Sequence, residues 1–377
     1  MYRDQYLKLF YAAFAVAKYF YADFAGITPA ATFLRIKTIG ITRIMKLNKK
    51  IKILVNYVLG PLLFLWLSYS LFRQVKKQPD LPGAWDAIKQ TPLNKVILYT
   101  GSVLVLMLLN WLIETKKWQL AIQKIQSISL SKAFKAILSG VSFSATTPNR
   151  MGEYAGRVLF LNEGNRLRSV ALTIVCSMSQ LIVTLFMGCV ALGILQDKMS
   201  GSTILSTDSL WIKIFLYGSL IALLVLLLIY FRLSVFIRLA ERIPWFSKNL
   251  YLVKDLEDID RNLLLKLLSL SCARFIIFCL QYFLLFRLFK VDINWWQCFF
   301  VLSVVFLILA VIPTFAIADL GIRGNITWRL MQLFTINTLG VTLATAGIWF
   351  INLVLPAIAG SLLIASGKLF KKRELED

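Results

Sequence analysis

The stretch that decides the fold reads Thr146-Thr147-Pro148-Asn149-Arg150-Met151-Gly152-Glu153-Tyr154-Ala155-Gly156-Arg157, and it lies between long apolar runs. Its proline, glycines and charges predict a break in helical backbone, which we call the first turn. A bilayer core holds no water to satisfy a broken backbone, so such a break is tolerated only where protein or a wet cavity surrounds it. Charged residues there are costly and usually mark a binding point or a transport path.

A second turn of the same kind lies near the end of the chain and reads Pro313-Thr314-Phe315-Ala316-Ile317-Ala318-Asp319-Leu320-Gly321-Ile322-Arg323-Gly324. In both turns a proline precedes an acid, an arginine follows the acid four residues later, and a glycine lies close to the acid. The shared pattern indicates that the two halves of the chain are related.

The composition around these turns is that of an integral membrane protein. Of the 377 residues, 58% are hydrophobic, and the mean hydropathy is +0.72, whereas soluble domains are about 45–50% apolar. The formal net charge of +23 is typical of cytoplasmic loops that face anionic headgroups. No compact basic region lies outside the apolar runs, so the sequence predicts no nucleic-acid partner.

The side-chain inventory excludes several kinds of chemistry. Histidine is absent, which excludes imidazole bases, Ser-His relays and histidine metal sites. The five cysteines lie in apolar segments without a C-x-x-C spacing, so they indicate small core residues rather than a disulfide framework or a zinc site. The sequence therefore predicts no metal and no cofactor.

Residues 1–44 differ from the rest because they are aromatic and basic and contain no clear full span. Met45 opens a basic stretch that reads like a natural cytoplasmic start before a first span. Residues 1–44 are therefore interpreted either as the product of an over-called start codon or as an amphipathic segment on the membrane surface. Residues 45–377 are interpreted as one transmembrane domain.

Five uncharged runs, and a sixth run that carries Lys266, Arg274 and Arg287, are long enough or nearly long enough to cross a hydrocarbon core of about 30 Å. The expected spans are Ile53–Phe72, Val96–Ile113, Ser169–Gln196, Ile214–Phe231, Asn262–Phe289 and a last one that starts near Thr338. Two further regions, Ala136–Asn149 and Ile293–Ala318, run into the two turns. Each is predicted to pair with the segment after its turn as a re-entrant helical hairpin. The predicted fold class is an all-α polytopic membrane bundle of about six spans and two hairpins.

The distribution of Lys and Arg sets the expected orientation. The segment before the first span, the loop Thr115–Lys135 and the C-terminal residues are basic, which places all three in the cytoplasm. The loop Arg73–Lys95 is also basic, although this layout puts it outside. Each half would hold three crossings and one hairpin. Halves of about 45–212 and 213–370 would then be inverted repeats, a recurrent transporter design.

The first turn supplies three candidate binding residues. Glu153 follows Arg150 by three residues and precedes Arg157 by four, so on a helix the three side chains share one face. An arginine fork suits phosphodiester oxygens, and free N–H groups at helix N-termini suit phosphate. The alternative interpretation is a structural ion pair that holds a re-entrant helix in place.

The second turn and one mid-span arginine complete the candidate set. Asp319 and Arg323 repeat the acid–arginine spacing, and Arg274 lies within an expected span, where it cannot face lipid cheaply. Arg274 is expected to pair with Glu153 or Asp319, or to contact a phosphate. The residues expected to break the backbone or to allow a close approach are Pro148, Gly152, Pro313, Gly321 and Gly324.

At these two turns the chain resembles a known family. The segment Thr147-Pro148-Asn149-Arg150-Met151-Gly152-Glu153-Tyr154 is similar to the T-P-x-R-x-G-E signature of the flippase-like transmembrane region of lysylphosphatidylglycerol synthases. Pro313 through Arg323 resembles that family's later G-x-x-G-V-R-E element. Gly324 stands where the family often has an acid after the arginine, and Asp319 is expected to serve instead. The resemblance covers roughly residues 45–370.

The resemblance implies lipid translocation or lipid-linked handling. Bifunctional members append a soluble aminoacyl-transferase domain after the membrane part, whereas this chain reads Lys368 to Asp377 there, so no aminoacyl transfer by this chain is expected. The expected protein is a flippase or transporter of the plasma (inner) membrane that moves a phospholipid, or another lipid with a polar headgroup, through a central polar cavity.

The expected partners are membrane lipids with anionic or phosphate-bearing headgroups, and a separately encoded synthase or transferase. Two alternatives stay open, a membrane enzyme that acts on lipid-linked substrates and a non-catalytic scaffold of an envelope-lipid synthesis complex. No metal-ligand cluster or nucleophile motif in the sequence supports the enzyme.

Overall fold

The computed structural model describes residues 69, 81–145, 152–200, 209–241, 256–257, 259–312 and 316–365. These residues form helices joined by short connections, and no strand occurs among them. All of them belong to one unit that begins at Asn56. Residues 1–44 lie outside the described residues, and so does the first expected span apart from Tyr69.

Five helical segments are long and apolar enough to cross a membrane, and they coincide with the other five expected spans. They are formed by α5 (Leu93–Ile122), α8 (Arg166–Ser200, preceded by the short 3₁₀ helix η3, Glu163–Asn165), α9 (Ser209–Phe231), α12 (Arg261–Leu288), and a last segment made of α15 (Thr338–Trp349), η6 (Phe350–Val354) and α16 (Leu355–Ala365). Two short helices, α4 (Leu81–Lys89) and α10 (Leu233–Glu241), lie outside these spans.

The surface of α9 explains why its composition is so uniform. No charged residue lies between Ile214 and Phe231, and Ile221, Leu224 and Leu228 are exposed. In water such a helix would bury this surface, but hydrocarbon tails are as apolar as leucine and accept it. The apolar exterior of α9 is therefore a lipid-facing surface.

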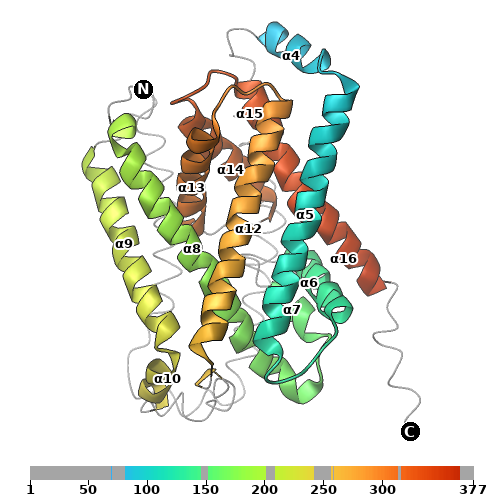
Figure 1. The fold of residues 1–377 in the computed structure, drawn as a ribbon, viewed down its shortest axis with the longest axis vertical. Helices are drawn as coiled ribbons and strands as arrows, with labels where there is room; N and C mark the ends of the chain where they lie inside the picture. Colours follow the sequence, from blue (N-terminus) through green and yellow to red (C-terminus); the bar gives the residue numbers. More distant parts are fainter. Residues whose placement is uncertain are drawn as a thin grey trace. The chain divides into compact units, whose positions relative to one another are not determined.

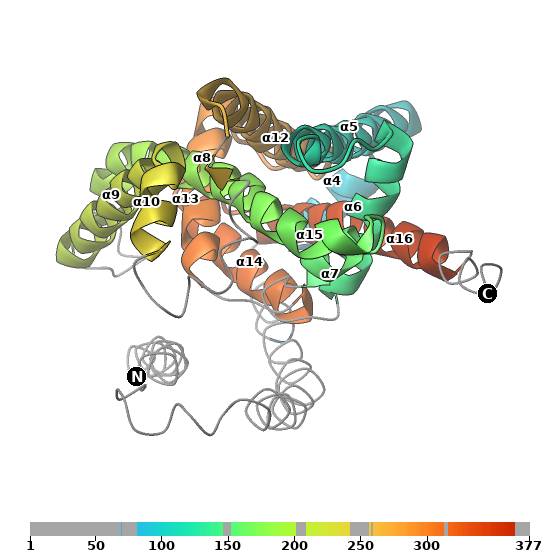
Figure 2. The same ribbon diagram turned by 90° about the horizontal axis from the view of Figure 1, so that it is seen from below.

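The central helix of the arrangement is α8, which packs against α5, α7, α9, α12 and α13 (Figure 2). α5 and α12 pack along each other (Figure 1). The two run antiparallel, because Leu120 near the end of α5 and Leu263 near the start of α12 line the same pocket.

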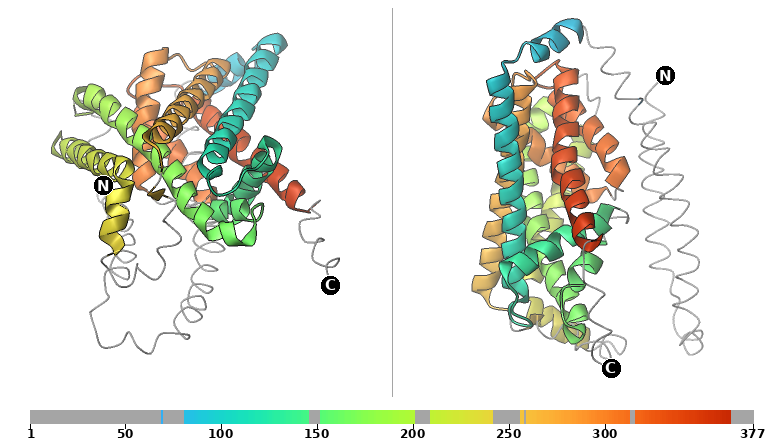
Figure 3. Two further views of the ribbon diagram at one scale, coloured as in Figure 1. Left: turned by 60° about the horizontal axis from the view of Figure 1, so that its bottom comes forward. Right: turned by 90° about the vertical axis from the view of Figure 1, so that its right-hand side faces the viewer.

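The first helix pair consists of α6 (Leu130–Ala145) and α7 (Gly152–Val158). A Cβ atom built on Gly156 would lie 2.4 Å from the Cα of Gly140, so the two backbones touch where neither residue has a side chain. α6 also packs against α16 (Figure 3). There a Cβ atom on Gly360 would lie 2.0 Å from the carbonyl oxygen of Leu138. α6 is therefore held closely on two sides.

Hydrogen bonds join the entry and the exit of the first helix pair. The backbone N–H of Asn162, after α7, donates to Oε1 of Gln126 at 3.1 Å, and Nδ2 of Asn165 donates to the carbonyl of Ile125 at 3.1 Å. Gln126 and Ile125 belong to the connection between α5 and α6. The pair therefore begins and ends beside the end of α5.

The second helix pair, α13 (Trp295–Val311) and α14 (Ala316–Met331), is joined in the same way. Asn294 and Gln297 form a capping box that starts α13. After α14, Nδ2 of Asn337 donates to the carbonyls of Phe289 and Lys290 at 3.2 and 3.0 Å. This pair begins and ends beside the end of α12. Because α5 and α12 are antiparallel, the two pairs open at opposite ends, as Figure 1 shows.

The last span changes its winding partway along. Its middle turn, η6, is a π-helix between two α-helical stretches. Before it, α15 packs on α12, where a Cβ atom on Gly347 would lie 3.2 Å from Cδ1 of Leu285. After it, α16 packs on α6. The π turn thus separates two segments of one span that contact different partners.

Two predicted boundaries are wrong. The expected loop Thr115–Lys135 is helical at both ends, because α5 continues to Ile122 and α6 begins at Leu130. The expected second turn is helical from Ala316 onward, since Asp319 and Arg323 pair one helical turn apart and so satisfy each other within α14. Gly152, Gly321 and Gly324 likewise lie within helices.

Candidate functional site

A row of polar side chains along one face of α5 carries the site. Asn110, Glu114 and Lys117 follow one another at spacings of four and three residues, which places them on the same side of a helix. They are among the most buried polar residues described, with exposed fractions of 1%, 5% and 1%. Polar groups buried to this degree in a membrane helix require partners from neighbouring helices.

Glu114 binds three basic side chains. Its Oε1 lies 2.9 Å from Nη2 of Arg157, and its Oε2 lies 2.9 Å from Nζ of Lys117. Nη1 of Arg274 also donates to Oε2. A single carboxylate thus joins α5, α7 and α12. We call Glu114, Lys117, Glu153, Arg157 and Arg274 the Glu114 cluster.

Arg157 connects the first helix pair to this cluster. Besides Glu114, its Nη2 faces Oε1 of Glu153 at 3.4 Å, one turn back on α7. Arg157 is 2% exposed although it lies on a helix of seven residues. The predicted pairing of Glu153 with Arg157 is therefore present, and it lies within the Glu114 cluster.

Arg274 has polar and aromatic neighbours. Its Nε donates to Oδ1 of Asn110 at 2.7 Å, and its Nη1 lies 3.5 Å from Oε1 of Gln180 on α8. The guanidinium lies 5.9 Å from the ring centroid of Trp111 and 6.0 Å from that of Phe278. Aromatic faces stabilise a desolvated cation. This surrounding explains how an arginine is accommodated in the middle of α12.

Arg274 pairs with a different acid from the two that were expected. The sequence analysis named Glu153 or Asp319, but the acid in contact is Glu114. The expected span ended at Ile113 and the expected loop began at Thr115, so Glu114, which lies between them, was assigned no role. Because α5 continues for two more turns, that carboxylate points into the protein instead of into solvent.

A chain of hydroxyl groups extends the cluster to α8. Nζ of Lys117 donates to Oγ of Ser271 at 3.3 Å, and Ser271 shares a hydrogen bond of 2.8 Å with Ser179. Ser271 and Ser179 are fully buried. Lys117, which the sequence analysis placed in a cytoplasmic loop, is thus bound within the contact of α5, α8 and α12.

The charges of the cluster do not balance. It contains two carboxylates and three basic groups, so one formal positive charge remains. Burying an ion costs several kcal/mol even after the protein relaxes around it. Removing one partner of a buried ion pair destabilises a protein by about 3–5 kcal/mol. A buried surplus of positive charge suits an anionic ligand, and phosphate groups are well matched to arginine.

The second turn supplies a smaller group of charges. Asp319 and Arg323 form the predicted ion pair on α14, with Oδ2 and Nη2 3.0 Å apart. Tyr282 of α12 lies beside Arg323. Tyr282 lies on the same helix as Arg274, and the two are about 12 Å apart along the helix axis at about 1.5 Å per residue. α14 also packs against α6, so the second helix pair contacts the first.

Three of the six predicted binding residues lie together in the structure. Glu153, Arg157 and Arg274 meet through Glu114, and Asp319 and Arg323 form a second pair. Arg150, Pro148 and Pro313 lie outside the described residues. Glu114, Lys117 and Asn110 were missed. The signal that could have found them is their shared helical face, which starts with Asn110 near the end of an apolar run and continues past it.

No group of three His, Cys, Asp or Glu side chains that could hold a metal ion occurs in the part of the chain that the structure describes. The five cysteines are free, and four of them are buried.

Comparison with individual curated proteins finds no match to this chain. A protein family does match it. The sequence fits the lysylphosphatidylglycerol synthase TM region over residues 53–360, which spans both helix pairs and every helix of the Glu114 cluster. That match covers most of the chain and agrees with five apolar helices long enough to cross a membrane. The chain is therefore an integral membrane protein of lipid-related function and belongs to the lysylphosphatidylglycerol synthase transmembrane-region family.

Proposed function

We propose that this protein moves or handles a phospholipid, or a lipid-linked polar headgroup, as a flippase-like transporter of the plasma membrane. The observation that carries the proposal is the Glu114 cluster, in which five charged side chains from α5, α7 and α12 meet inside apolar helices. Ionic residues at such depth are expensive, and they are retained in membrane proteins mainly along the paths of polar substrates.

The two helix pairs support the same proposal. We infer that each is a re-entrant hairpin, because its entry and exit meet at one end and its helices are short. The 16 residues of α6 span about 24 Å at 1.5 Å per residue, less than a hydrocarbon core of about 30 Å. Short helices that meet charged residues within the membrane are a recurrent feature of transporters with inverted repeats.

In this proposal the headgroup binds where Arg157 and Arg274 lie, and the acyl chains stay in lipid beside the apolar helices. Anionic or phosphate-bearing headgroups are the favoured partners because the cluster carries surplus positive charge. Asp319 and Arg323, at the second helix pair, would receive the headgroup after it leaves the Glu114 cluster. The C-terminus would lie in the cytoplasm.

The test is lipid movement in proteoliposomes that contain the purified protein and a fluorescently labelled phospholipid. Arg274→Lys is the sharpest variant, because it keeps the positive charge beside Glu114 but removes the planar fork that also binds Asn110. We expect a rate at least tenfold lower than that of the wild type. Arg238→Ala is the matched control, since that arginine is 75% exposed in its side chain, and it should retain the full rate.

Other outcomes would favour the alternatives. Full lipid movement in Arg274→Lys and Arg157→Ala would make the Glu114 cluster purely architectural. Turnover of a lipid substrate by wild-type protein in detergent, without movement between leaflets, would identify a membrane enzyme. Neither activity, together with a stable co-purifying synthase or transferase, would identify a scaffold.

A further inference from the structure

The Glu114 cluster contains more hydrogen-bond donors than acceptors. Within the described part of the chain, buried N–H donors with no partner include Nδ2 of Asn110, Nε1 of Trp111 and Nε of Arg157. All three residues contact the cluster or belong to it, and all are at least nine-tenths buried. Unpaired buried donors are costly, and native structures rarely retain them without a purpose.

Exchanging the oxygen and nitrogen of the Asn110 amide would not remove its unpaired donor. Nε of Arg274 can only donate, so the atom of Asn110 that faces it at 2.7 Å must be the oxygen. The amide nitrogen of Asn110 is then left as a donor without an acceptor. Arg157 uses Nη2 for both of its carboxylates, which leaves its Nε unused.

What would satisfy this arrangement is a group that only accepts hydrogen bonds and carries one negative charge. A phosphodiester has two non-bridging oxygens that share one negative charge, and in this it resembles a carboxylate. Glu114 presents such a pair of oxygens, one to Arg157 and the other to Lys117 and Arg274. The Glu114 carboxylate therefore has the charge and the two-oxygen geometry of the group that the surplus cations would bind.

We propose that Glu114 is an internal competitor that occupies Arg157 and Arg274 until a phosphodiester anion displaces it. This inference rests on the proposed function and identifies the part of the ligand that the site recognises. On binding, the anion takes the two arginines and the unused N–H groups of Asn110 and Arg157, while Glu114 keeps Lys117. The cluster then contains three anionic and three basic groups, and its charges balance.

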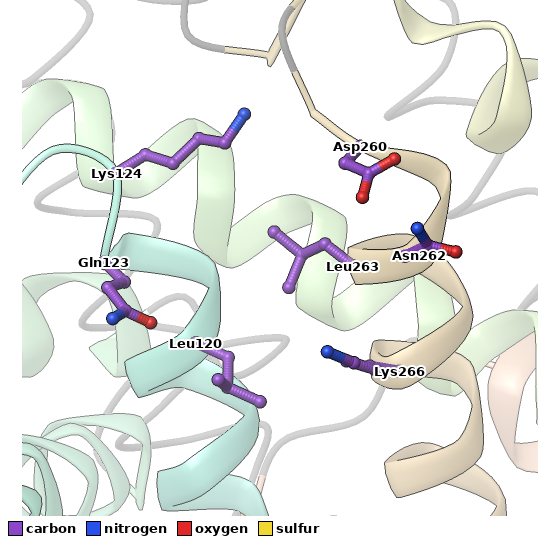
Figure 4. A pocket seen from close by; sticks show the side chains of 7 residues that line it. All are labelled: Leu120, Gln123, Lys124, Asp260, Asn262, Leu263 and Lys266. Carbon is purple, nitrogen blue, oxygen red and sulfur yellow. The ribbon is translucent and has the colours of Figure 1, made fainter.

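In this inference the anion enters from a pocket near the cluster. It has a volume of about 290 Å³ and lies between the end of α5 and the start of α12, as Figure 4 shows. Its lining consists of Leu120, Gln123, Lys124, Asp260, Asn262, Leu263 and Lys266. Leu120 follows Lys117 on α5 by three residues, so the pocket lies about one helical turn from the cluster. The lining carries two lysines and one acid, Asp260, so one formal positive charge remains to attract an anionic headgroup.

The inference is tested by equilibrium binding to the purified full chain in a nonionic detergent. Three probes are compared by native mass spectrometry and by thermal unfolding: phosphatidylglycerol, inorganic phosphate, and diacylglycerol, which lacks the phosphate. Glu114→Gln removes the competing charge but keeps the shape. We expect it to bind phosphatidylglycerol at least tenfold more tightly than the wild type and to gain more thermal stability from it. Diacylglycerol should show no such gain.

Two further variants complete the test. Asn110→Ala should weaken phosphatidylglycerol binding at least threefold, because it removes one of the unused donors. Glu163→Gln makes the same chemical change as Glu114→Gln, but in a side chain that is 69% exposed, so it should bind like the wild type. If Glu114→Gln does not yield folded protein, Glu114→Asp provides the same comparison, since the shorter carboxylate cannot keep all three contacts and should also bind the lipid more tightly.

The outcomes separate this inference from the proposed function. A tenfold gain in Glu114→Gln without lipid movement by the wild type supports the competitor and rejects the transporter. Lipid movement without any gain in binding rejects the competitor alone. The same gain with inorganic phosphate, but none with phosphatidylglycerol, supports the anion site and excludes a lipid headgroup as its source. Equal or weaker phosphatidylglycerol and phosphate binding by Glu114→Gln and Glu114→Asp overturns the inference.

Discussion

At the scale of a single residue, the buried carboxylate of Glu114 holds together side chains from three helices. It is the acid that Lys117, Arg157 and Arg274 share, and it joins helices that are far apart in sequence. Ion pairs at the protein surface contribute little, because solvent already stabilises both charges. In a buried cluster the loss of one partner leaves the others uncompensated, so the effect of a substitution is much larger.

Removing the negative charge of Glu114 should therefore destabilise the protein. We expect Glu114→Gln to lower the free energy of unfolding by about 3–5 kcal/mol, measured by denaturation in mixed micelles without added phospholipid. Glu163→Gln breaks an exposed pair with Arg166 and should change it by no more than about 0.5 kcal/mol.

A second substitution distinguishes charge compensation from loss of shape. If the cost arises from unpaired cations, the double variant Glu114→Gln/Arg274→Gln should lose clearly less than the sum of its two single variants. Strictly additive losses would show that Glu114 and Arg274 act independently, and they would contradict the role assigned to the cluster.

At the scale of helices, the packing of α6 depends on glycine. Gly140 and Gly156 let α6 and α7 touch, and Gly360 lets α16 approach the carbonyl of Leu138. Without a hydrophobic driving force in lipid, such close contact provides much of the attraction between helices. Arg157 lies on α7, so the separation of α6 and α7 also determines the position of an arginine in the Glu114 cluster.

Gly156→Ala should push α6 and α7 apart, since its new Cβ atom would meet backbone atoms of Gly140 and Ser139. We expect a loss of about 1–3 kcal/mol in stability and a slower rate of lipid movement. Gly193→Ala is the control, because no atom lies within 4 Å of a Cβ atom built there. Thermal unfolding and the proteoliposome assay together check both effects, and equal behaviour of the two variants would contradict the role of the glycine contact.

The connections of the two helix pairs can be tested at the same scale. Asn337 donates to Phe289 and Lys290, and its Oδ1 accepts from the backbone N–H of Gly340 at 2.8 Å. Asn337→Ala removes all three hydrogen bonds and should cost about 1–3 kcal/mol. Hydrogen exchange should then be faster in the connections around α13 and α14 than around α6. Uniform acceleration across the protein would indicate a global loss of stability instead.

At the scale of the whole described unit, the two helix pairs open at opposite ends. Gln126 marks the opening of the first pair, and Lys290 marks that of the second. If the long helices cross a membrane, these two positions must face opposite sides of it. The proposed function needs this arrangement, because a headgroup that crosses the membrane must be reached from both sides.

This arrangement predicts a labelling pattern. In a variant without the five native cysteines, Gln126→Cys and Lys290→Cys should react with a membrane-impermeant maleimide from opposite sides of sealed vesicles. Glu163→Cys, in the connection that follows the first pair, should react from the same side as Gln126→Cys. Labelling of Gln126→Cys and Lys290→Cys from one side would contradict the topology.

The sequence was a good guide to the long helices and a poor guide to the buried charges. Spans such as Ile214–Phe231 could be predicted because a bilayer demands an uncharged run of a given length, whatever the helix packs against. The pairs Glu153–Arg157 and Asp319–Arg323 could be predicted because their spacing is local. The contact of Arg274 with Glu114 could not, because it joins residues 160 positions apart.

The boundary of α5 shows the same limit. A charge after an apolar run usually marks the membrane surface, and Lys117 was for that reason placed in the expected loop Thr115–Lys135. Only the contacts of α5 with α7, α8 and α12 reveal that the charges of Glu114 and Lys117 are compensated inside the protein. Compensation of charge between helices cannot be recognised from the residue types of one segment alone.

The π turn of the last span has a consequence for how the chain tolerates changes in length. Each residue of an α-helix advances the side chains by about 100°, and a π turn accommodates extra residues within otherwise regular winding. Deleting one residue between Phe350 and Val354 would let ordinary α-helical winding resume and would leave both Gly347 beside Leu285 and Gly360 beside Leu138, whereas deleting one residue between Leu355 and Gly360 would rotate Gly360 by about 100° away from Leu138. The π turn is therefore a place where the span tolerates the loss of a residue, while a loss of the same size in α16 would separate this helix from α6 without affecting membrane insertion.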